Sequence, residues 1–263
     1  MSATDVTGRR QTLSMPPKPK PPRPKGPQPR KGPTARSNTR LLFVLGAGVL
    51  VGVVAVALRV VLGGNKSKTP KNIKANLSAI TGISQHGLVL GNPAAKITLT
   101  EYVDTSCPIC QNYMLTTFPK ISQRYVRTGD VKVEDRVLAF VGPSSARGRE
   151  LVLAAARQNK AFQLAALLYQ NQGDETQAWL TDSFAHTLAA KVPGLDVEQL
   201  FTEASSQAVA QAGATADSEA QTDGVTGTPT FVLTTKDGKR HLLGSGSPGF
   251  APFVKALDHA LAQ

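Results

Sequence analysis

The feature that most constrains this chain is a pair of cysteines, Cys107 and Cys110, which are separated only by Pro108 and Ile109. Because these are the only two cysteines in 263 residues, a scaffold of structural disulfides is excluded. A bond between residues so close in sequence would constrain the unfolded chain little, so the pair would also be a poor structural staple. The pair therefore predicts either redox chemistry or a metal site.

Zinc binding is the main alternative to redox chemistry. A structural zinc ion usually takes four protein ligands, and the chain has no second pair of closely spaced cysteines. The missing ligands would have to come from histidines that form no ligand-like cluster in the sequence, namely His86, His186, His241 and His259. We therefore expect a redox-active pair and no metal.

The residues before and within the pair predict how it would react. Ile97–Val103 is β-branched and aromatic, which is typical of a buried strand, and a helix is expected to begin near Cys107. Pro108 suits the first turn of a helix, where its missing N–H costs nothing. The sulfur of Cys107 would then face unpaired N–H groups that favour the attacking thiolate. Cys110, nearly one turn later, would resolve the resulting mixed disulfide.

Two acidic residues precede the cysteines. Glu101 falls within the predicted buried strand, so it could be a proton-transfer group beneath Cys110 whose ionisation burial disfavours. The alternative is an acid that faces solvent at the edge of a sheet. Asp104 is nearer to the pair but falls in the loop after the strand, where we expect it to be solvated.

The order of elements predicts an α/β domain over residues 80–263. Helices are expected at 114–127, bent at Pro119, and at 248–261, with several more in an Ala- and Leu-rich block at about 144–216. Lys236-Asp237-Gly238-Lys239 carries the Asp-Gly signal of a hairpin turn. Strands are expected at 87–90, 97–103, 131–141, 230–235 and 240–244. This order predicts a thioredoxin-like fold with an inserted helical subdomain.

A second motif, Gly227-Thr228-Pro229-Thr230-Phe231, lies far along the chain. A proline directly before a central strand is unusual, and a cis peptide bond would explain it. Read alone, the segment fits a trans proline that ends a loop better than a cis proline. Its value comes from its combination with a CxxC pair at a strand-to-helix junction.

With these residues in view, the chain resembles the DsbA-like thioredoxin-fold proteins, especially the membrane-anchored, extracytoplasmic group. The resemblance covers about residues 86–262. It rests on the segments Leu90-Gly91-Asn92-Pro93, Glu101-Tyr102-Val103-Asp104 leading into Cys107-Pro108-Ile109-Cys110, and Gly227-Thr228-Pro229-Thr230-Phe231.

The resemblance implies a role for each residue of the site. Cys107 would be the nucleophile and Cys110 the resolving cysteine, with Glu101 as the buried acid. Thr228 and Pro229 would be joined by a cis bond beside the disulfide and would bind substrate. Pro108 and Ile109 would tune the redox potential. Strongly oxidising members often have histidine or another polar or aromatic residue at the position of Ile109, so the redox direction stays open.

The N-terminal part of the chain predicts a membrane anchor. Residues 1–40 are rich in Pro, Lys and Arg and are expected to form a disordered cytoplasmic tail. Residues 41–62 are apolar except for Arg59, long enough for a transmembrane signal-anchor helix, and 63–79 would be a linker. Ten Lys and Arg residues precede the apolar run, which predicts a cytoplasmic N-terminus and an extracytoplasmic catalytic domain.

The N-terminal part of the chain allows two further interpretations, a cleaved signal peptide and a nucleic-acid-binding segment. Ala55-Val56-Ala57 has the form of a signal-peptide cleavage site, but the apolar run is longer than a typical signal peptide requires. The net charge of +12 suggests nucleic-acid binding at first sight. Residues 71–263 are electrically balanced, with 17 basic and 17 acidic residues, so we expect no nucleic-acid partner.

Together these features predict an extracytoplasmic thiol–disulfide oxidoreductase that forms or exchanges disulfides in exported proteins. It would need no cofactor beyond the Cys107–Cys110 disulfide, and a membrane redox partner would recycle that pair. A disulfide reductase or isomerase is the alternative within the enzyme class. A non-catalytic thioredoxin-fold chaperone or complex subunit is the alternative outside it.

Overall fold

The computed structural model describes Lys74 and residues 76–263. The predicted cytoplasmic tail at 1–40, the predicted anchor at 41–62 and the start of the linker lie outside the described residues. Within the described part, none of the helices combines the length and the apolar character needed to cross a membrane.

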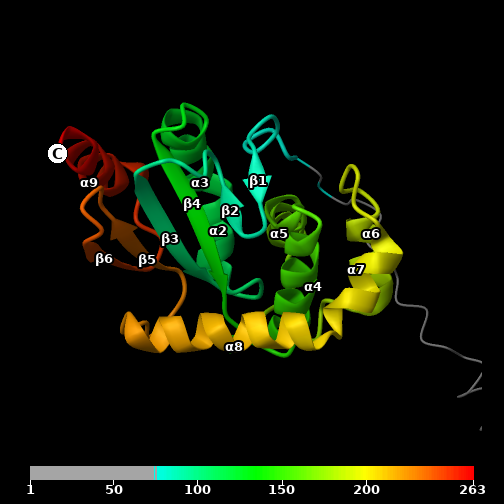
Figure 1. The fold of residues 1–263 in the computed structure, drawn as a ribbon. Coiled ribbons are helices and arrows are strands. Elements are labelled where there is room, and N and C mark those ends of the chain that lie inside the picture. Colours follow the sequence, from blue (N-terminus) through cyan, green and yellow to red (C-terminus); the bar gives the residue numbers. More distant parts are fainter. Residues whose placement is uncertain (1–73, 75) are drawn as a thin grey trace, which may run out of the picture. The chain divides into compact units, whose positions relative to one another are not determined.

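A six-stranded sheet lies at the centre of the described domain, in the order β1-β2-β4-β3-β5-β6 (Figure 1). The pair β3 and β4 is parallel and all other neighbouring strands are antiparallel. The strands are β1 (Gln85–His86), β2 (Val89–Leu90), β3 (Ile97–Val103), β4 (Val131–Val137), β5 (Thr230–Thr234) and β6 (Arg240–Ser245).

The two central strands differ in their burial, as their sequences predict. β3 is buried at six of its seven positions, because it lies between β4 and β5 and is covered on both faces. β4 alternates instead, with its odd-numbered residues buried and its even-numbered residues partly exposed. The buried residues of β4 are Val131, Val133, Asp135 and Val137, so one carboxylate replaces a valine on the inner face.

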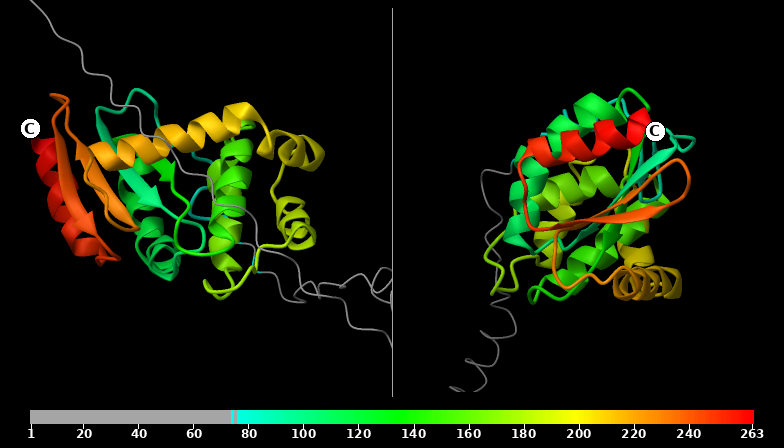
Figure 2. Two further views of the ribbon diagram at one scale, coloured as in Figure 1. Left: turned by 90° about the horizontal axis from the view of Figure 1, so that it is seen from below. Right: turned by 90° about the vertical axis from the view of Figure 1, so that its left-hand side faces the viewer.

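One face of the sheet carries the helices nearest the cysteines. These are α2 (Pro108–Thr116), α3 (Phe118–Ile121), the π-helix η1 (Ser122–Val126) and the C-terminal α9 (Phe250–Ala262). Aromatic packing joins them to the sheet, since the ring of Phe253 lies 5.7 Å from Tyr113 and 4.8 Å from Phe231. Figure 2 shows α9 beside the β5–β6 hairpin at one end of the domain.

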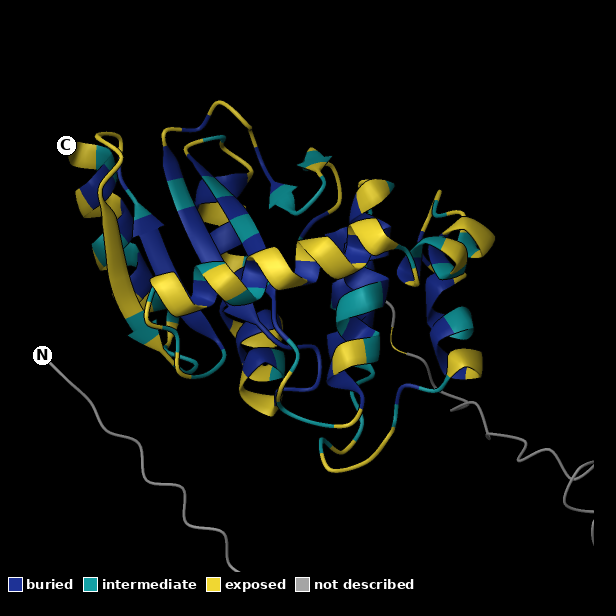
Figure 3. Cartoon of the chain, turned by 60° about the horizontal axis from the view of Figure 1, so that its bottom comes forward, coloured by how far each residue is buried: buried dark blue, intermediate teal, exposed yellow. Residues whose placement is uncertain are grey.

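Five helices lie between β4 and β5 in the sequence and form the inserted block. They are α4 (Ser145–Arg157), α5 (Ala161–Gln170), α6 (Asp182–Ala189), α7 (Val197–Ala204) and α8 (Gln207–Thr222). The long helix α8 returns across the second face of the sheet, where Ala216 and Ala220 pack against Tyr102 and Val232 (Figure 3). Helices therefore cover both faces of the central sheet, and the rest of the inserted helical block lies to one side of it.

The predicted helix at 114–127 is real but begins earlier and is divided. Helix α2 begins at Pro108, and the chain is interrupted at Thr117 before α3. Pro119 lies in the first turn of α3. Because proline has no N–H, it cannot donate a helical hydrogen bond to a carbonyl earlier in the chain. The proline thus divides the helix rather than bending it.

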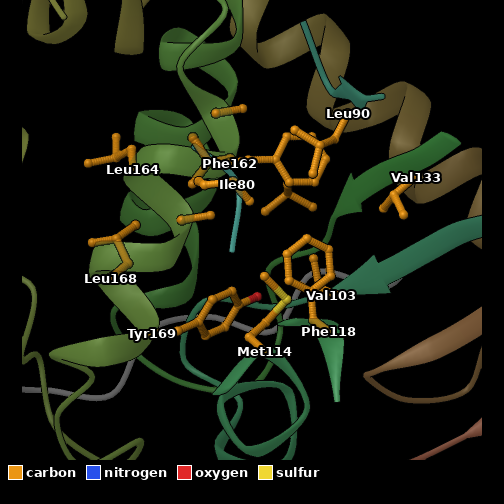
Figure 4. Close-up of a cluster of buried hydrophobic side chains, with 14 of the residues drawn as sticks. Ile80, Leu90, Val103, Met114, Phe118, Val133, Phe162, Leu164, Leu168 and Tyr169 are labelled. Atoms are coloured by element: carbon orange, nitrogen blue, oxygen red, sulfur yellow. The ribbon is translucent and has the colours of Figure 1, made fainter. Parts of the chain in front are cut away.

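A single apolar core joins the sheet to the helical block (Figure 4). Phe118 of α3 stacks on Phe162 of α5 with ring centroids 6.4 Å apart. Around these rings lie Leu90, Val103, Met114, Val133, Leu164 and Leu168, all of them buried. This packing fixes the C-terminal end of α5 beside the start of α2, where the cysteines are located.

Candidate active site

Cys107 caps the N-terminus of α2, directly after the turn that follows β3. Its Sγ accepts a hydrogen bond from the backbone N–H of Cys110 at 3.2 Å, and Pro108 occupies the first turn of the helix as predicted. Only 4% of Cys107 is exposed and Cys110 is fully buried, whereas Ile109 between them is 49% exposed. Cys107 therefore retains a slight exposure at the start of the helix, whereas Cys110 has none.

The second sequence motif lies against the first cysteine. In the thiol form, Cys107 donates a hydrogen bond from Sγ to the carbonyl oxygen of Thr228 at 3.2 Å. The Thr228–Pro229 peptide bond is cis. The topology explains this meeting of residues 121 positions apart, since β5, which begins at Thr230, pairs directly with β3.

The two cysteines have opposite acidities. The hydrogen bond with Cys110 is the main cause that lowers the pKa of Cys107 to about 6, although burial opposes it. Burial raises the pKa of Cys110, and the nearby Cys107 sulfur raises it further. At neutral pH Cys107 is therefore mostly thiolate, the reactive form, while Cys110 holds its proton.

Asp104 lies at the centre of the turn between β3 and α2 and is completely buried. One carboxylate oxygen accepts hydrogen bonds from Ser106 N–H and Ser145 Oγ, both at 2.8 Å. The other accepts from the N–H groups of Phe140 at 2.9 Å and Val141 at 3.1 Å. The prediction that Asp104 is solvated is wrong, because the loop after β4 folds back over it. Asp104 ties the active-site turn to the helical block.

Gln172, just after α5, supports the same turn from the other side. Its Nε2 donates to the carbonyl oxygens of Thr105 at 2.7 Å and Cys107 at 3.2 Å. The sequence analysis did not identify Gln172. No local pattern could have revealed it, since its partners lie more than 60 residues away and only the tertiary fold brings them together.

Glu101 lies on the inner face of β3 and is completely buried. The hydroxyl of Tyr113 donates to its Oε1 at 2.5 Å. Burial raises the pKa of Glu101 well above its usual value, and the nearby Asp135 raises it further. The solvent-facing alternative for Glu101 is thus excluded, and the structure adds two buried partners, Tyr113 and Asp135, that the sequence analysis did not identify.

Two exposed apolar side chains, Ile109 and Phe140, lie at the edge of the sheet where the cysteines are located. Phe140, in the loop after β4, is 59% exposed. Because β3 and β4 are parallel, this loop lies at the same edge of the sheet as the turn that carries Cys107.

Across residue 74 and residues 76–263, no group of three or more His, Cys, Asp and Glu side chains is arranged to hold a metal ion.

A cysteine pair at the start of the helix after a central strand, with the residue before a cis proline hydrogen-bonded to its first sulfur, defines a thioredoxin-fold protein with a redox-type site. The family model described as thioredoxin matches residues 84–242, which is more than half of the chain. The chain belongs to this family, and the predicted thioredoxin-like α/β fold is confirmed.

Comparison with known proteins adds relatives of related chemistry. Over 118 residues the chain is 28% identical to Disulfide bond formation protein D of Bacillus subtilis (strain 168), a match that covers 43% of this chain and 51% of that protein. The chain thus spans about half the length of this curated relative.

Two solved structures share the fold. Oxidised BdbD from Bacillus subtilis has a TM-score of 0.59 at 21% identity, with 69% of this chain and 98% of that chain covered. Alpha-DsbA1 from Wolbachia pipientis has a TM-score of 0.56 at 19% identity, with 66% and 90% covered. The resemblance to DsbA-type proteins that the motifs suggested therefore extends to the arrangement of the whole domain.

Proposed function

We propose that this chain is a thiol–disulfide oxidoreductase that forms or exchanges disulfides in exported proteins through Cys107 and Cys110. The observation that carries the proposal is the contrast between the two sulfurs. Cys107 retains a slight exposure and has a pKa lowered to about 6 by its hydrogen bond with Cys110. Cys110 is buried and its pKa is raised by that burial. The relative named Disulfide bond formation protein D supports the same chemistry.

The oxidising reaction proceeds in two exchange steps. A substrate thiolate attacks Sγ of Cys107 in the Cys107–Cys110 disulfide, so a substrate–Cys107 bond forms and Cys110 leaves with the electron pair and takes up a proton. A second substrate thiolate then attacks the substrate sulfur of the mixed disulfide and releases Cys107 as a thiolate. The substrate loses two electrons and the cysteine pair gains them.

The neighbouring residues have distinct parts in this scheme. The backbone of Thr228, beside the sulfur of Cys107, would pair with an extended segment of substrate, while Pro229 offers no competing N–H. Glu101 would exchange protons with Cys110, which lies on the helix above it. Pro108 and Ile109 would set the redox potential. The site needs no cofactor beyond the cysteine pair in this scheme.

The reduced pair must pass its two electrons onward, which requires a redox partner. We place this partner in the membrane, because the basic tail at 1–40 and the apolar run at 41–62 favour a single-pass anchor with the catalytic domain outside the cytoplasm. A membrane-impermeant thiol reagent, applied to intact wall-permeable cells after reduction, should label the cysteines. Labelling only after lysis would contradict this topology.

The direction of the reaction depends on Ile109. Its side chain is exposed between the cysteines and has no hydrogen-bond donor for the Cys107 thiolate. This absence makes a reductase or isomerase the second candidate within the same chemistry. Equilibration of the Cys107–Cys110 pair with glutathione would decide, because a potential near that of thioredoxin indicates a reductase and one near that of DsbA an oxidase.

The test of the proposed function is oxidation of a reduced, unfolded protein by the oxidised full chain. Cys107→Ser should abolish the activity. In a second assay the reduced variants are mixed with a protein that carries a disulfide. Cys110→Ser should form a mixed disulfide through Cys107 that nothing resolves and that is visible on a non-reducing gel, whereas Cys107→Ser should trap little. If Cys107→Ser retains activity, or both variants trap substrates equally, the proposed oxidoreductase chemistry is wrong.

A further inference from the structure

A second buried carboxyl group lies beside Glu101. Asp135 of β4 is the direct partner of Glu101 in the parallel β3–β4 ladder. Paired residues of neighbouring strands project from the same face of a sheet with their Cβ atoms about 5 Å apart. Glu101 is completely buried and Asp135 is 2% exposed, so both carboxyl groups lie inside the protein.

Neither carboxyl group is fully hydrogen-bonded. Oε2 of Glu101 and Oδ1 of Asp135 are buried without a hydrogen-bond partner among the described residues. Tyr113 supplies the single hydroxyl that reaches Glu101. Buried polar atoms are usually paired, so two open oxygens on adjacent strands indicate groups arranged for more than packing.

The pair faces the helix that carries the buried cysteine, because Tyr113 of that helix donates to Glu101. Cys110 and Tyr113 are three residues apart on the buried side of α2, and the pKa of Tyr113 is raised by burial and then by the charges of Glu101, Asp135 and Cys110. The strand on the other side of Glu101 presents the apolar Phe231. The titratable and charged groups around the pair are Cys110 and Tyr113 from α2, Tyr169 from α5, and Glu134 and Arg136, the neighbours of Asp135 on β4.

Two buried carboxyl groups this close do not ionise independently. When the first proton leaves, the two carboxyl groups share the proton that remains. Loss of the second proton would place two like charges side by side in an apolar interior. The pair therefore works between a state with two protons and a state with one. A lone buried carboxyl group lacks this shared, singly charged state.

We propose that Asp135 is a positioning residue that forms a diacid with Glu101, and that this diacid supplies a proton to the Cys110 sulfur when it leaves and takes it back when it attacks. This inference rests on the proposed function. When Cys110 leaves as a thiolate, one proton moves to its sulfur and the diacid keeps the other with one negative charge. When Cys110 attacks a mixed disulfide at Cys107, the proton returns, the Cys110–Cys107 bond forms and the substrate thiolate departs.

The experiment isolates the Cys110 step with 5,5′-dithiobis(2-nitrobenzoate). The reduced full chain in detergent releases one thionitrobenzoate when Cys107 attacks the reagent. It releases a second when Cys110 attacks the resulting mixed disulfide. Because the chain has only two cysteines, both phases are read without background. The rate of the second phase is measured from pH 5 to pH 10.

Asp135→Asn removes the neighbouring charge that raises the pKa of Glu101. The midpoint of the second-phase pH profile should therefore move down by about one unit or more, while the first phase is unchanged. Glu101→Gln should slow the second phase about 100-fold below pH 8, the lower end of what a positioned acid or base contributes. Asp130→Asn is the matched control, since Asp130 is exposed in the bend before β4, and should leave the profile unchanged.

The outcomes separate the two proposals. A normal first phase with an unshifted midpoint in Asp135→Asn would overturn the diacid and leave the proposed function intact. Absence of the first phase in the unmodified chain would overturn the proposed function and the diacid together. Asp135→Ser, smaller and neutral, repeats the test should the amide not fit the site, and it should shift the midpoint in the same direction.

Discussion

Two buried acids lie three residues apart on the same segment, and their surroundings differ sharply. Asp104 accepts four hydrogen bonds from two other parts of the chain and from its own turn. Glu101 accepts one, from Tyr113, and has a second oxygen without a partner. Both are completely buried, so burial alone does not distinguish a structural acid from a functional one.

The difference teaches that the number of donors determines what a buried carboxyl group can do. A carboxyl group with every oxygen paired holds its neighbours in place, and any change of its protonation would break that arrangement. One with few donors, near another acid, has a raised pKa and can exchange protons. Asp104 thus shapes the turn that presents Cys107, and Glu101 has the raised pKa that the proposed proton exchange with Cys110 requires.

The largest expected effect is that of Asp104→Ala. The substitution would leave four donors around the turn without their acceptor, each at a cost of about 1 kcal/mol or more, so we expect a loss of about 4 kcal/mol in the free energy of unfolding. Urea denaturation of the oxidised chain measures it. Asp174→Ala is the control, because Asp174 is exposed and accepts hydrogen bonds only within its own loop. A loss no greater than that of the control would contradict the structural role of Asp104.

The second prediction concerns pH and the other acid. The pKa of Asp135 is raised by burial to about 8, and that of Glu101 is raised as well. The native state therefore binds more protons than the unfolded state between about pH 4 and pH 8, and stability falls as the pH rises through this window. We expect a loss on the order of 3 kcal/mol in the oxidised chain, where neither cysteine titrates.

Asp135→Asn provides the comparison for this pH dependence. Denaturation curves at pH 4, 6 and 8 should show a clear downward slope for the unmodified chain and a flatter one for the variant. A stability that rises with pH across this window in the unmodified chain would show that the two carboxyl groups are not protonated in the native state.

Much of this architecture could be predicted from the sequence because it depends on local patterns. Ile97–Val103 is a strand because its β-branched residues suit a central position, and the structure has those bounds. Asp135 was also visible in principle, since the alternation of β4 places it on the face that otherwise carries only valines. The alternation of β4 alone predicts an ordinary strand, and the buried carboxyl group of Asp135 is the departure from that pattern.

The remaining features depend on contacts between distant segments. The burial of Asp104 comes from residues 140–145, and the support of the active-site turn comes from Gln172 in the inserted block. A loop after a strand is normally solvated, so no local rule would bury Asp104. The position of Pro229 against Cys107 was available only through the resemblance to a known family.

The third prediction compares the same change, a carboxyl group replaced by an amide, at Asp104 and at Glu101. Asp104→Asn replaces one acceptor oxygen by a donor that would face N–H or hydroxyl donors, so we expect a loss of about 2 kcal/mol. On folding at pH 8, Glu101 must either bury a charge or take up a proton, and Glu101→Gln removes that cost, so it should stabilise the oxidised chain by about 1 kcal/mol. Thermal and urea unfolding at pH 8 give both values. Changes of the same sign in the two variants would remove the distinction between the acids.

The smallest effects should come from the donors rather than the acids. Ser145→Ala removes one of four donors to Asp104, and Tyr113→Phe removes the single donor to Glu101. We expect each to cost about 1 kcal/mol at pH 8.

The losses in Tyr113→Phe and Ser145→Ala should differ in their pH dependence. The Tyr113 hydrogen bond lowers the pKa of Glu101, so it favours the charged form, and its removal should raise that pKa further. The loss in Tyr113→Phe should therefore grow as the pH rises, because the variant lacks a hydrogen bond that favours the ionised form of Glu101, whereas the loss in Ser145→Ala should not follow the ionisation of Glu101. Parallel stability curves for the two variants would mean that Glu101 is held by its donor in the same way as Asp104, and that the titrating acid beneath Cys110 is not Glu101.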